Sequence, residues 1–245
     1  MAERAVHDEP RELSHSVEDY LRSVLLLEEH SIAPTPQRLR EILGVALATI
    51  SGTLKRLERE GLLYRGDKHR VHLTPVGRVA ASCVMRRNRL VERFLSDVLH
   101  VPFAEIAIEA NRMEHAISPA TERQLYLLLG RPQTCPHGNA IESETPARGA
   151  RLASFRFGRI EVVRVLEAVA MDTSFMAWLD THGVLPGCSF EIVGNSSARI
   201  LLAGESGTVA VPGPAAELIM ARFASDAAPT VGKPAGPHPP APAEL

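Results

Sequence analysis

The sequence of 245 residues has little cysteine and no long apolar run. Its three cysteines, Cys83, Cys135 and Cys188, include no Cys-x-x-Cys pair, which argues against a disulfide framework and a structural zinc site. No run of about 18 apolar residues is present, so we expect no transmembrane helix. The charged start at Met1–Arg11 is unlike a secretory signal. These absences predict a protein of the reducing cytoplasm.

Recognisable catalytic motifs are lacking as well. The sequence contains no Gly-rich phosphate loop, no nucleophile elbow and no His-Glu-x-x-His segment, so we expect no enzymatic activity. With 45% hydrophobic and 23% charged residues, the composition is that of a folded globular protein rather than a disordered one.

The overall charge of −2 hides an uneven distribution. Residues 36–93 hold 13 Lys and Arg against 5 Asp and Glu, whereas residues 1–35 hold 3 against 8 and residues 94–245 hold 11 against 16. A basic segment within a nearly neutral chain is typical of a polyanion-binding surface, and equally of a solvated, charged helix face.

The basic segment carries the element order of a winged helix-turn-helix domain, which we place at residues 14–74. Cap residues and apolar spacing predict helices over about 14–28, 36–43 and 46–60, then strands over 62–64 and 71–73 around a basic turn. The third helix places four apolar residues on one stripe: Leu47, Ile50, Leu54 and Leu57. Its opposite face is small and basic, as a helix in the major groove of DNA requires.

The residues that we expect to contact DNA are of two kinds. Thr49, Ser51 and Gly52 would lie at base edges in the major groove. Five basic side chains would mainly contact phosphates: Lys55, Arg56, Arg59, Lys68 and Arg70. The alternative is a small α+β domain whose basic surface binds no DNA.

The other parts of the chain differ in composition. Residues 75–130 predict two long helices, the second interrupted at Ser118-Pro119, with apolar surface that a second subunit would bury. The remaining parts are a loose arm at 1–13, a Gly- and Pro-rich linker at 131–158, a small barrel or sandwich at 159–222 and a Pro/Ala-rich, disordered tail at 223–245.

One short segment collects side chains that can bind metal. Asn111, Glu114 and His115 are spaced i, i+3 and i+4, so they are neighbours on one helix face. Oxygen and nitrogen donors suit a divalent transition metal, although a surface ion pair gives the same pattern. Three more polar residues could face the same space if their helices pack together: Asp19, Asn88 and Glu92.

Seven blocks extend these patterns over about residues 16–222: Glu18–Arg22, Thr49–Ser51, Arg56–Leu62, Leu73–Gly77, Asn88–Arg93, Met113–Ser118 and Cys135–Asn139. In order and spacing they resemble the diphtheria-toxin-repressor family of metal-dependent (iron/manganese) transcriptional regulators. The resemblance implies a mainly α fold with a winged helix-turn-helix head. It also implies a helical metal-binding and dimerisation domain at 75–130 and a small C-terminal SH3-like β-barrel at 159–222.

The resemblance implies a primary metal site made of Asp19, Asn111, Glu114 and His115. Asp19 stands where iron-type members have methionine, and Asn111 stands where they have cysteine. Without these sulfur ligands, hard oxygen donors favour Mn(II) first and Fe(II) second. Manganese-type members often have glutamate where this chain has Arg22.

The ancillary site of iron-type members is implied to be lost or reshaped. Of its helical ligands only Glu92 remains, because Asn88 and Ala107 stand where histidines are expected. Met171 and Ser174 take the positions of ligands from the barrel. The Cys135-Pro136-His137 segment matches a family loop, and we interpret it as linker structure rather than as a ligand pair.

The resemblance therefore implies a cytoplasmic, homodimeric repressor with no membrane partner. Loaded with Mn(II) or Fe(II), it would bind palindromic double-stranded operator DNA and control metal homeostasis genes. One alternative is a metal-independent winged-helix regulator gated by another ligand or partner. The other is a non-DNA interaction module that works through the barrel and the Pro-rich tail.

Overall fold

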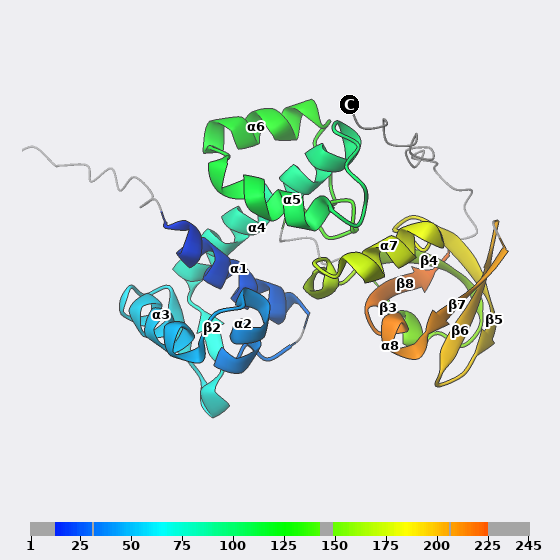
Figure 1. Cartoon of the computed structure of the whole chain (residues 1–245), viewed down its shortest axis with the longest axis horizontal. Coiled ribbons are helices and arrows are strands. Elements are labelled where there is room, and N and C mark those ends of the chain that lie inside the picture. Colours follow the sequence, from blue (N-terminus) through cyan, green and yellow to red (C-terminus); the bar gives the residue numbers. More distant parts are fainter. Residues whose placement is uncertain (1–12, 31, 143–148, 206, 225–245) are drawn as a thin grey trace, which may run out of the picture. The chain divides into compact units, whose positions relative to one another are not determined.

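The computed structural model describes residues 13–30, 32–142, 149–205 and 207–224 (Figure 1). The chain divides into two compact units, residues 1–84 and 85–245, which we describe separately. The expected loose arm and disordered tail lie almost entirely outside the described residues, as does the middle of the expected linker. Within the described residues, every helix is too short or too polar to cross a membrane.

The first unit has the predicted winged helix-turn-helix order. Its elements are α1 (His15–Glu29), α2 (Pro36–Leu43), α3 (Leu47–Arg59), β1 (Leu63–Arg65), the 3-10 turn η1 (Asp67–His69) and β2 (Val71–Leu73). The Thr35 side chain caps α2 by accepting from the Arg38 N–H at 3.3 Å, and Pro36 occupies the first position. Gly44 ends α2 with φ of 67°, a left-handed conformation that glycine adopts without strain.

The buried face of α3 differs from the prediction at one residue. Ile50, Leu54 and Leu57 are buried as expected, but Leu47 is 46% exposed. Leu47 is the first residue of α3, so it lies at the end of the apolar stripe. Its place on the apolar stripe therefore does not bring it into the core.

The wing is a two-stranded antiparallel ribbon attached closely to the helix that follows it. Leu63 of β1 pairs with Leu73 of β2. Helix α4 (Pro75–Asp97) follows directly on Thr74, whose hydroxyl donates to the Gly61 carbonyl at 2.7 Å and accepts from the Gly77 N–H at 3.0 Å. A Cβ atom at Gly77 would lie 1.9 Å from the Leu62 carbonyl oxygen, so only glycine fits there.

The helical part of the second unit continues from α4 through α5 (Ile106–Met113), the 3-10 turn η2 (Glu114–Ala116) and α6 (Pro119–Leu128). The predicted interruption at Ser118 is confirmed, because the Ser118 side chain accepts from the Thr121 N–H at 3.2 Å and starts α6. Glu114 and His115 lie in η2, just beyond the last residue of α5, rather than inside one continuous helix.

The C-terminal part is a six-stranded antiparallel sheet in the order β3-β8-β4-β5-β6-β7. Its strands are β3 (Ala150–Arg151), β4 (Gly158–Val165), β5 (Ser189–Asn195), β6 (Arg199–Gly204), β7 (Gly207–Pro212) and β8 (Ile219–Phe223). The edge strands β3 and β7 do not pair among the described residues, so this SH3-like fold is an open sheet and "barrel" describes it only loosely.

One hydrophobic core joins this sheet to two helices. Met176 and Leu179 of α7 (Thr173–Thr181) belong to the core, and α7 lies against the sheet (Figure 1). Ile106 and Ala107 of α5 belong to it as well. Ala107 is therefore a packing residue in this chain, and the residues that follow it in α5 and η2 are held at a fixed place in the second unit.

Candidate metal centre and DNA-binding surface

The predicted DNA-contact residues lie on α3 and on the turn of the wing, and the structure buries none of them. Most are exposed, and Ser51 is half-buried. A Cβ atom at Gly52 would meet nothing within 4 Å, so the surface of α3 is open at that point. Arg56 Nε is 3.9 Å from Glu60 Oε1, an exposed pair of little strength that leaves the guanidinium available. The surface has the steric openness and positive charge that a helix in the major groove needs.

Two of the predicted metal-site residues meet on neighbouring helices of the second unit. Asn88 of α4 donates its side-chain N–H to Asn111 Oδ1 of α5 at 3.1 Å. The Asn111 amide nitrogen lies 3.4 Å from Met171 Sδ. The structure therefore brings Asn88 and Asn111 together and places Met171 beside them, with the Asn111 oxygen already accepting one hydrogen bond.

Glu114 and His115 form a second pair in η2. Glu114 is fully buried, and His115 Nε2 is 3.6 Å from Glu114 Oε1. A buried carboxylate is costly unless positive charge or hydrogen bonds compensate it, so this position favours a cation. Asp19, the remaining predicted ligand, belongs to the first unit, where its Oδ1 is 3.7 Å from Arg22 Nη2 on α1.

A third group of side chains has the geometry of metal ligands, and of its members the sequence predicted only Glu92 as a candidate. Glu92 of α4 meets Cys135 and His137 from the segment after α6, and all three are buried. One ligand atom from each lies within 4.8 Å of the other two. Glu92 Oε2 is 3.2 Å from His137 Nδ1. The segment 135–137, interpreted from the sequence as linker structure, therefore places two ligand-type side chains beside Glu92.

Backbone contacts hold this loop in place. The Gly138 N–H donates to the Cys135 carbonyl, and the Val165 N–H of β4 donates to the His137 carbonyl, each at 2.9 Å. Gly138 has φ of 83°, and a Cβ atom there would lie 2.2 Å from the Val163 carbonyl oxygen. Only glycine fits this close approach, which positions Cys135 and His137 rigidly against Glu92.

Burial and charge set the protonation of this cluster. Burial raises the pKa of the Cys135 thiol well above its usual range, and the negative charges of Glu92 and Glu167 raise it further. Burial also opposes protonation of His137, but Glu92 outweighs this effect, so the His137 pKa is raised. His137 Nε2 is buried and has no hydrogen-bond partner among the described residues. Such an orphaned nitrogen is unusual in a protein interior.

These three side chains fit a divalent transition metal. They offer a carboxylate oxygen, a sulfur and an imidazole nitrogen, all from buried side chains. Close by, the buried Arg89 side chain donates to Glu167 Oε2 at 2.7 Å and to the Ala140 carbonyl at 2.6 Å. We call Glu92, Cys135 and His137 the buried ligand cluster.

Two family models match most of the chain. Residues 12–70 match the model described as the N-terminal DNA-binding domain of the iron-dependent repressor. Residues 74–143 match the model of its metal-binding and dimerisation domain. Helices α1–α3 and strand β1 fall within the first matched range, and the buried ligand cluster falls within the second.

Curated relatives and solved structures agree with these models. The iron-dependent repressor IdeR of Mycobacterium tuberculosis is 38% identical over 190 residues, which cover 71% of this chain and 82% of IdeR. The diphtheria toxin repressor of Corynebacterium diphtheriae is 31% identical over 195 residues, covering 75% and 86%. A solved manganese-dependent transcriptional repressor in complex with manganese is 28% identical and superposes with a TM-score of 0.76, covering 85% of this chain and all of that one. The chain therefore belongs to the iron-dependent repressor family of metal-dependent transcriptional regulators.

Proposed function

We propose that this protein is a transcriptional repressor that binds palindromic operator DNA as a homodimer when it is loaded with Mn(II) or Fe(II), and so controls metal homeostasis genes. The observation that carries the metal dependence is the fully buried Glu114 carboxylate beside His115. The buried ligand cluster, whose His137 nitrogen lacks a hydrogen-bond partner among the described residues, offers a second set of ligands. The DNA-binding part is supported by the open, basic face of α3. Both features agree with what the names of the relatives say of those proteins.

We infer a primary site made of Asp19, Asn111, Glu114 and His115, with Asn88 and Glu92 as neighbouring polar residues. Its support is the family resemblance together with the buried Glu114 carboxylate beside His115. A divalent metal supplies the positive charge that would hold such carboxylates together. Asp19 comes from α1, so a shared site would link the winged helix to the second unit and favour the state that binds DNA. That coupling is limited by the difference in metal affinity between the two states.

The sequence patterns and the family resemblance also assign the domains. We infer a winged helix-turn-helix domain at 14–74, a metal-binding and dimerisation domain at 75–130, a linker at 131–158 and an SH3-like domain at 159–222. The matched ranges 12–70 and 74–143 support the first boundary. They also indicate that the metal-binding domain continues past residue 130, into the loop that carries Cys135 and His137.

We rank Mn(II) ahead of Fe(II) as the physiological metal. The inferred primary site has oxygen and imidazole donors only, a set that suits Mn(II) and high-spin Fe(II). The buried ligand cluster adds one sulfur donor, Cys135, which suits softer metals better. The two sites are therefore expected to differ in metal preference, and the primary site is the one that sets the response.

The test is DNA binding by fluorescence anisotropy with a labelled palindrome. Binding is measured in chelator and then with Mn(II), anaerobic Fe(II), Co(II) and Zn(II). We expect tightening by at least about tenfold with Mn(II), which corresponds to a coupling of roughly 1.4 kcal/mol. Equal, tight binding in chelator would instead favour the metal-independent regulator, and absence of salt-dependent binding in every condition would favour a module that does not bind DNA.

Variants separate the two sites. Glu114→Ala and His115→Ala should abolish the metal response, because they remove ligands of the inferred primary site. Cys135→Ser should weaken metal binding at the buried ligand cluster, and Cys83→Ser is its matched control because Cys83 is exposed. A metal response that survives unchanged in the first two variants would contradict the primary site.

A further inference from the structure

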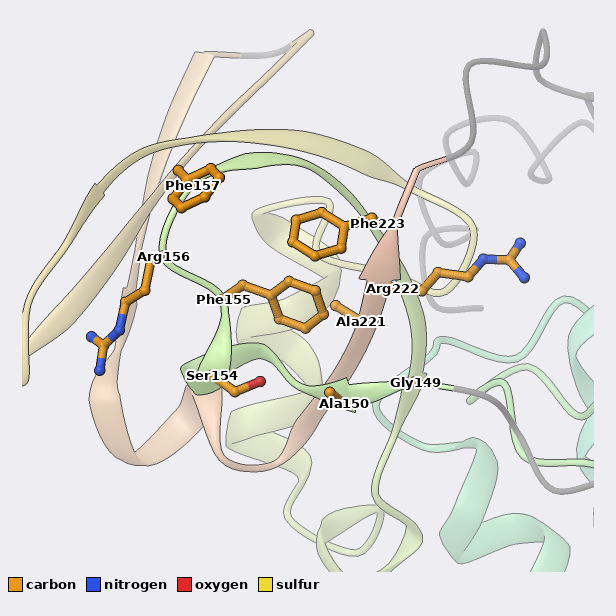
Figure 2. A pocket seen from close by; sticks show the side chains of 9 residues that line it. All are labelled: Gly149, Ala150, Ser154, Phe155, Arg156, Phe157, Ala221, Arg222 and Phe223. Carbon is orange, nitrogen blue, oxygen red and sulfur yellow. The ribbon is translucent and has the colours of Figure 1, made fainter.

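Two surface features away from the groups of metal ligands differ in their chemistry. In the second unit, Phe155, Phe157 and Phe223 line an open hollow beside the end of β8, and the Arg156 and Arg222 side chains point away from it (Figure 2). That hollow presents aromatic faces, which do not suit a polyanion. In the first unit, by contrast, a group of charged and aromatic side chains lies at the base of the wing, in the part of the chain predicted to bind DNA.

Glu28, in the last turn of α1, joins three elements of the first unit. Its Oε1 lies 3.4 Å from His72 Nδ1 of β2, and its Oε2 accepts from Arg78 Nη2 of α4. The Glu28 side chain is 17% exposed, whereas those of His72 and Arg78 are 32% and 51% exposed. A carboxylate that is mostly shielded from water and bonded to two nitrogen donors is held more firmly than one in an exposed surface pair.

The His72 ring packs against the turn of the wing. Tyr64 of β1 is its cross-strand partner, and the two rings stack with their centroids 5.2 Å apart. A Cβ atom at Gly66 would lie 2.9 Å from both Cδ2 and Nε2 of His72, so the start of the turn lies directly on the ring. A movement of the His72 ring would therefore change the packing of the turn.

The turn itself has a strained backbone that depends on its surroundings. Lys68 and His69 have φ of 54° and 61°, in the left-handed region that residues other than glycine rarely adopt. Such conformations persist only where neighbouring contacts hold them. Here the Gly66 N–H donates to the Arg70 carbonyl at 2.9 Å, and Gly66 lies on the His72 ring. The position of that ring therefore bears on the shape of the whole turn.

The turn carries Lys68 and Arg70, the two side chains of the wing that are predicted to contact phosphates. We propose that Glu28 is the positioning residue of the wing: it fixes the His72 ring and, through that ring, the turn that presents both basic side chains to the DNA backbone. This inference rests on the proposed binding of DNA. It does not depend on which metal activates the protein.

The sign of the effect separates positioning from simple electrostatics. Loss of an acidic side chain near a DNA-binding surface removes a repulsion and frees Arg78, so charge alone predicts tighter binding. A released wing predicts the opposite, because phosphate contacts are lost. Glu28→Gln keeps the size of the side chain and removes its charge. It should therefore weaken DNA binding if Glu28 positions the wing.

The test is the salt dependence of binding to a random-sequence DNA duplex of about 30 base pairs, measured by fluorescence anisotropy on the full chain with Mn(II). Phosphate contacts do not depend on sequence, so no operator is needed. Lys68→Ala/Arg70→Ala gives the slope that remains when the wing contacts are absent. Glu28→Gln should weaken binding roughly three- to tenfold and move the slope toward that value.

The matched control is Glu41→Gln, on α2. It removes the same charge from the same unit, but Glu41 pairs with Arg38 of its own helix and lies in an exposed pair. It should leave binding unchanged or tighten it slightly, because it has no contact with the wing among the described residues. The temperature of unfolding is measured for every variant, since a purely structural role of Glu28 would lower that temperature and leave the slope unchanged.

Two further variants show whether the effect passes through the wing. In the Lys68→Ala/Arg70→Ala background, Glu28→Gln should no longer weaken binding, because no wing contact is left to lose. Gly66→Ala displaces the His72 ring without changing any charge, since its methyl group would lie too close to that ring. It should lower the slope in the same direction as Glu28→Gln.

Three results would overturn this inference and leave the proposed function standing. Binding by Glu28→Gln as tight as that by Glu41→Gln would show that the wing does not need Glu28. An equal loss of affinity with and without Lys68 and Arg70 would place the effect of Glu28 elsewhere. A wild-type slope in Gly66→Ala would show that the ring does not support the turn. Absence of salt-dependent binding by the wild type would overturn both the inference and the proposed function.

Discussion

At the scale of single residues, the buried pair of Arg89 and Glu167 lies next to the buried ligand cluster. Arg89 Nη2 is 2.7 Å from Glu167 Oε2, and both side chains are buried. Removing one partner of a buried ion pair leaves an uncompensated charge, which costs about 3–5 kcal/mol. We therefore expect Arg89→Met to lower the free energy of unfolding by about that amount, measured by urea denaturation in chelator.

The double variant serves as the control for that prediction. Replacing both charges, as Arg89→Met/Glu167→Gln, should recover most of the stability, because no charge is then left buried. A double variant as unstable as the single one would show that Arg89 acts through its bond to the Ala140 carbonyl instead.

Arg56 gives the second prediction at this scale. On the exposed face of α3 it should contact a phosphate, so Arg56→Ala should weaken binding to all DNA sequences alike. The slope of log K against log salt should fall by about one unit. Arg199→Ala, an exposed arginine on β6, is the comparison and should leave the slope unchanged. A slope that stays constant in Arg56→Ala would exclude Arg56 from the phosphate contacts.

At the scale of elements, two glycines in the first unit should respond to alanine in opposite directions. At Gly77, the new Cβ would lie 1.9 Å from the Leu62 carbonyl oxygen and push α4 away from the wing, so Gly77→Ala should destabilise the unit by about 1–3 kcal/mol. At Gly52, inside α3, nothing lies within 4 Å, so Gly52→Ala should stabilise it by roughly 0.5–1 kcal/mol. Thermal unfolding measures both, and a loss of stability in Gly52→Ala would contradict the open surface of α3.

Sequence patterns predicted the elements wherever local chemistry decides them. Helix α2 begins after the cap residue Thr35 and ends before Gly44, and helix α6 begins after the cap residue Ser118, as expected from capping. The exposure of Leu47 could not be predicted, because helical periodicity gives the direction of a side chain and not where the packing partner ends.

One of the candidate sites could be predicted from the sequence and the other could not. The spacing of Glu114 and His115 was visible in the sequence, and both residues do meet in η2. The buried ligand cluster was not visible in the sequence, because Glu92 and His137 are 45 residues apart and meet only through the fold of the loop. That loop depends on Gly138 and on β4, and neither carries a local signal for metal binding.

At the scale of the whole molecule, two separate sets of ligands predict the metal content. We expect about two bound divalent metal ions per chain in the wild type and about one in either Cys135→Ser or Glu114→Ala, measured by elemental analysis after dialysis. Cys83→Ser should keep the wild-type content, since Cys83 is exposed and lies outside both sets. A wild-type content of one ion, lost in only one of the two variants, would leave a single functional site.

The strand order also bears on how the protein is made. β8 is the last strand in the chain, yet it lies between β3 and β4 inside the sheet. During synthesis, β4 lacks one neighbour until residues 219–223 have emerged, whereas the winged helix has all its elements by residue 84. Because the His137 carbonyl accepts a hydrogen bond from the Val165 N–H of β4, the loop that carries Cys135 and His137 reaches its final support only near the end of translation. The newborn chain therefore completes its winged helix before it completes the buried ligand cluster.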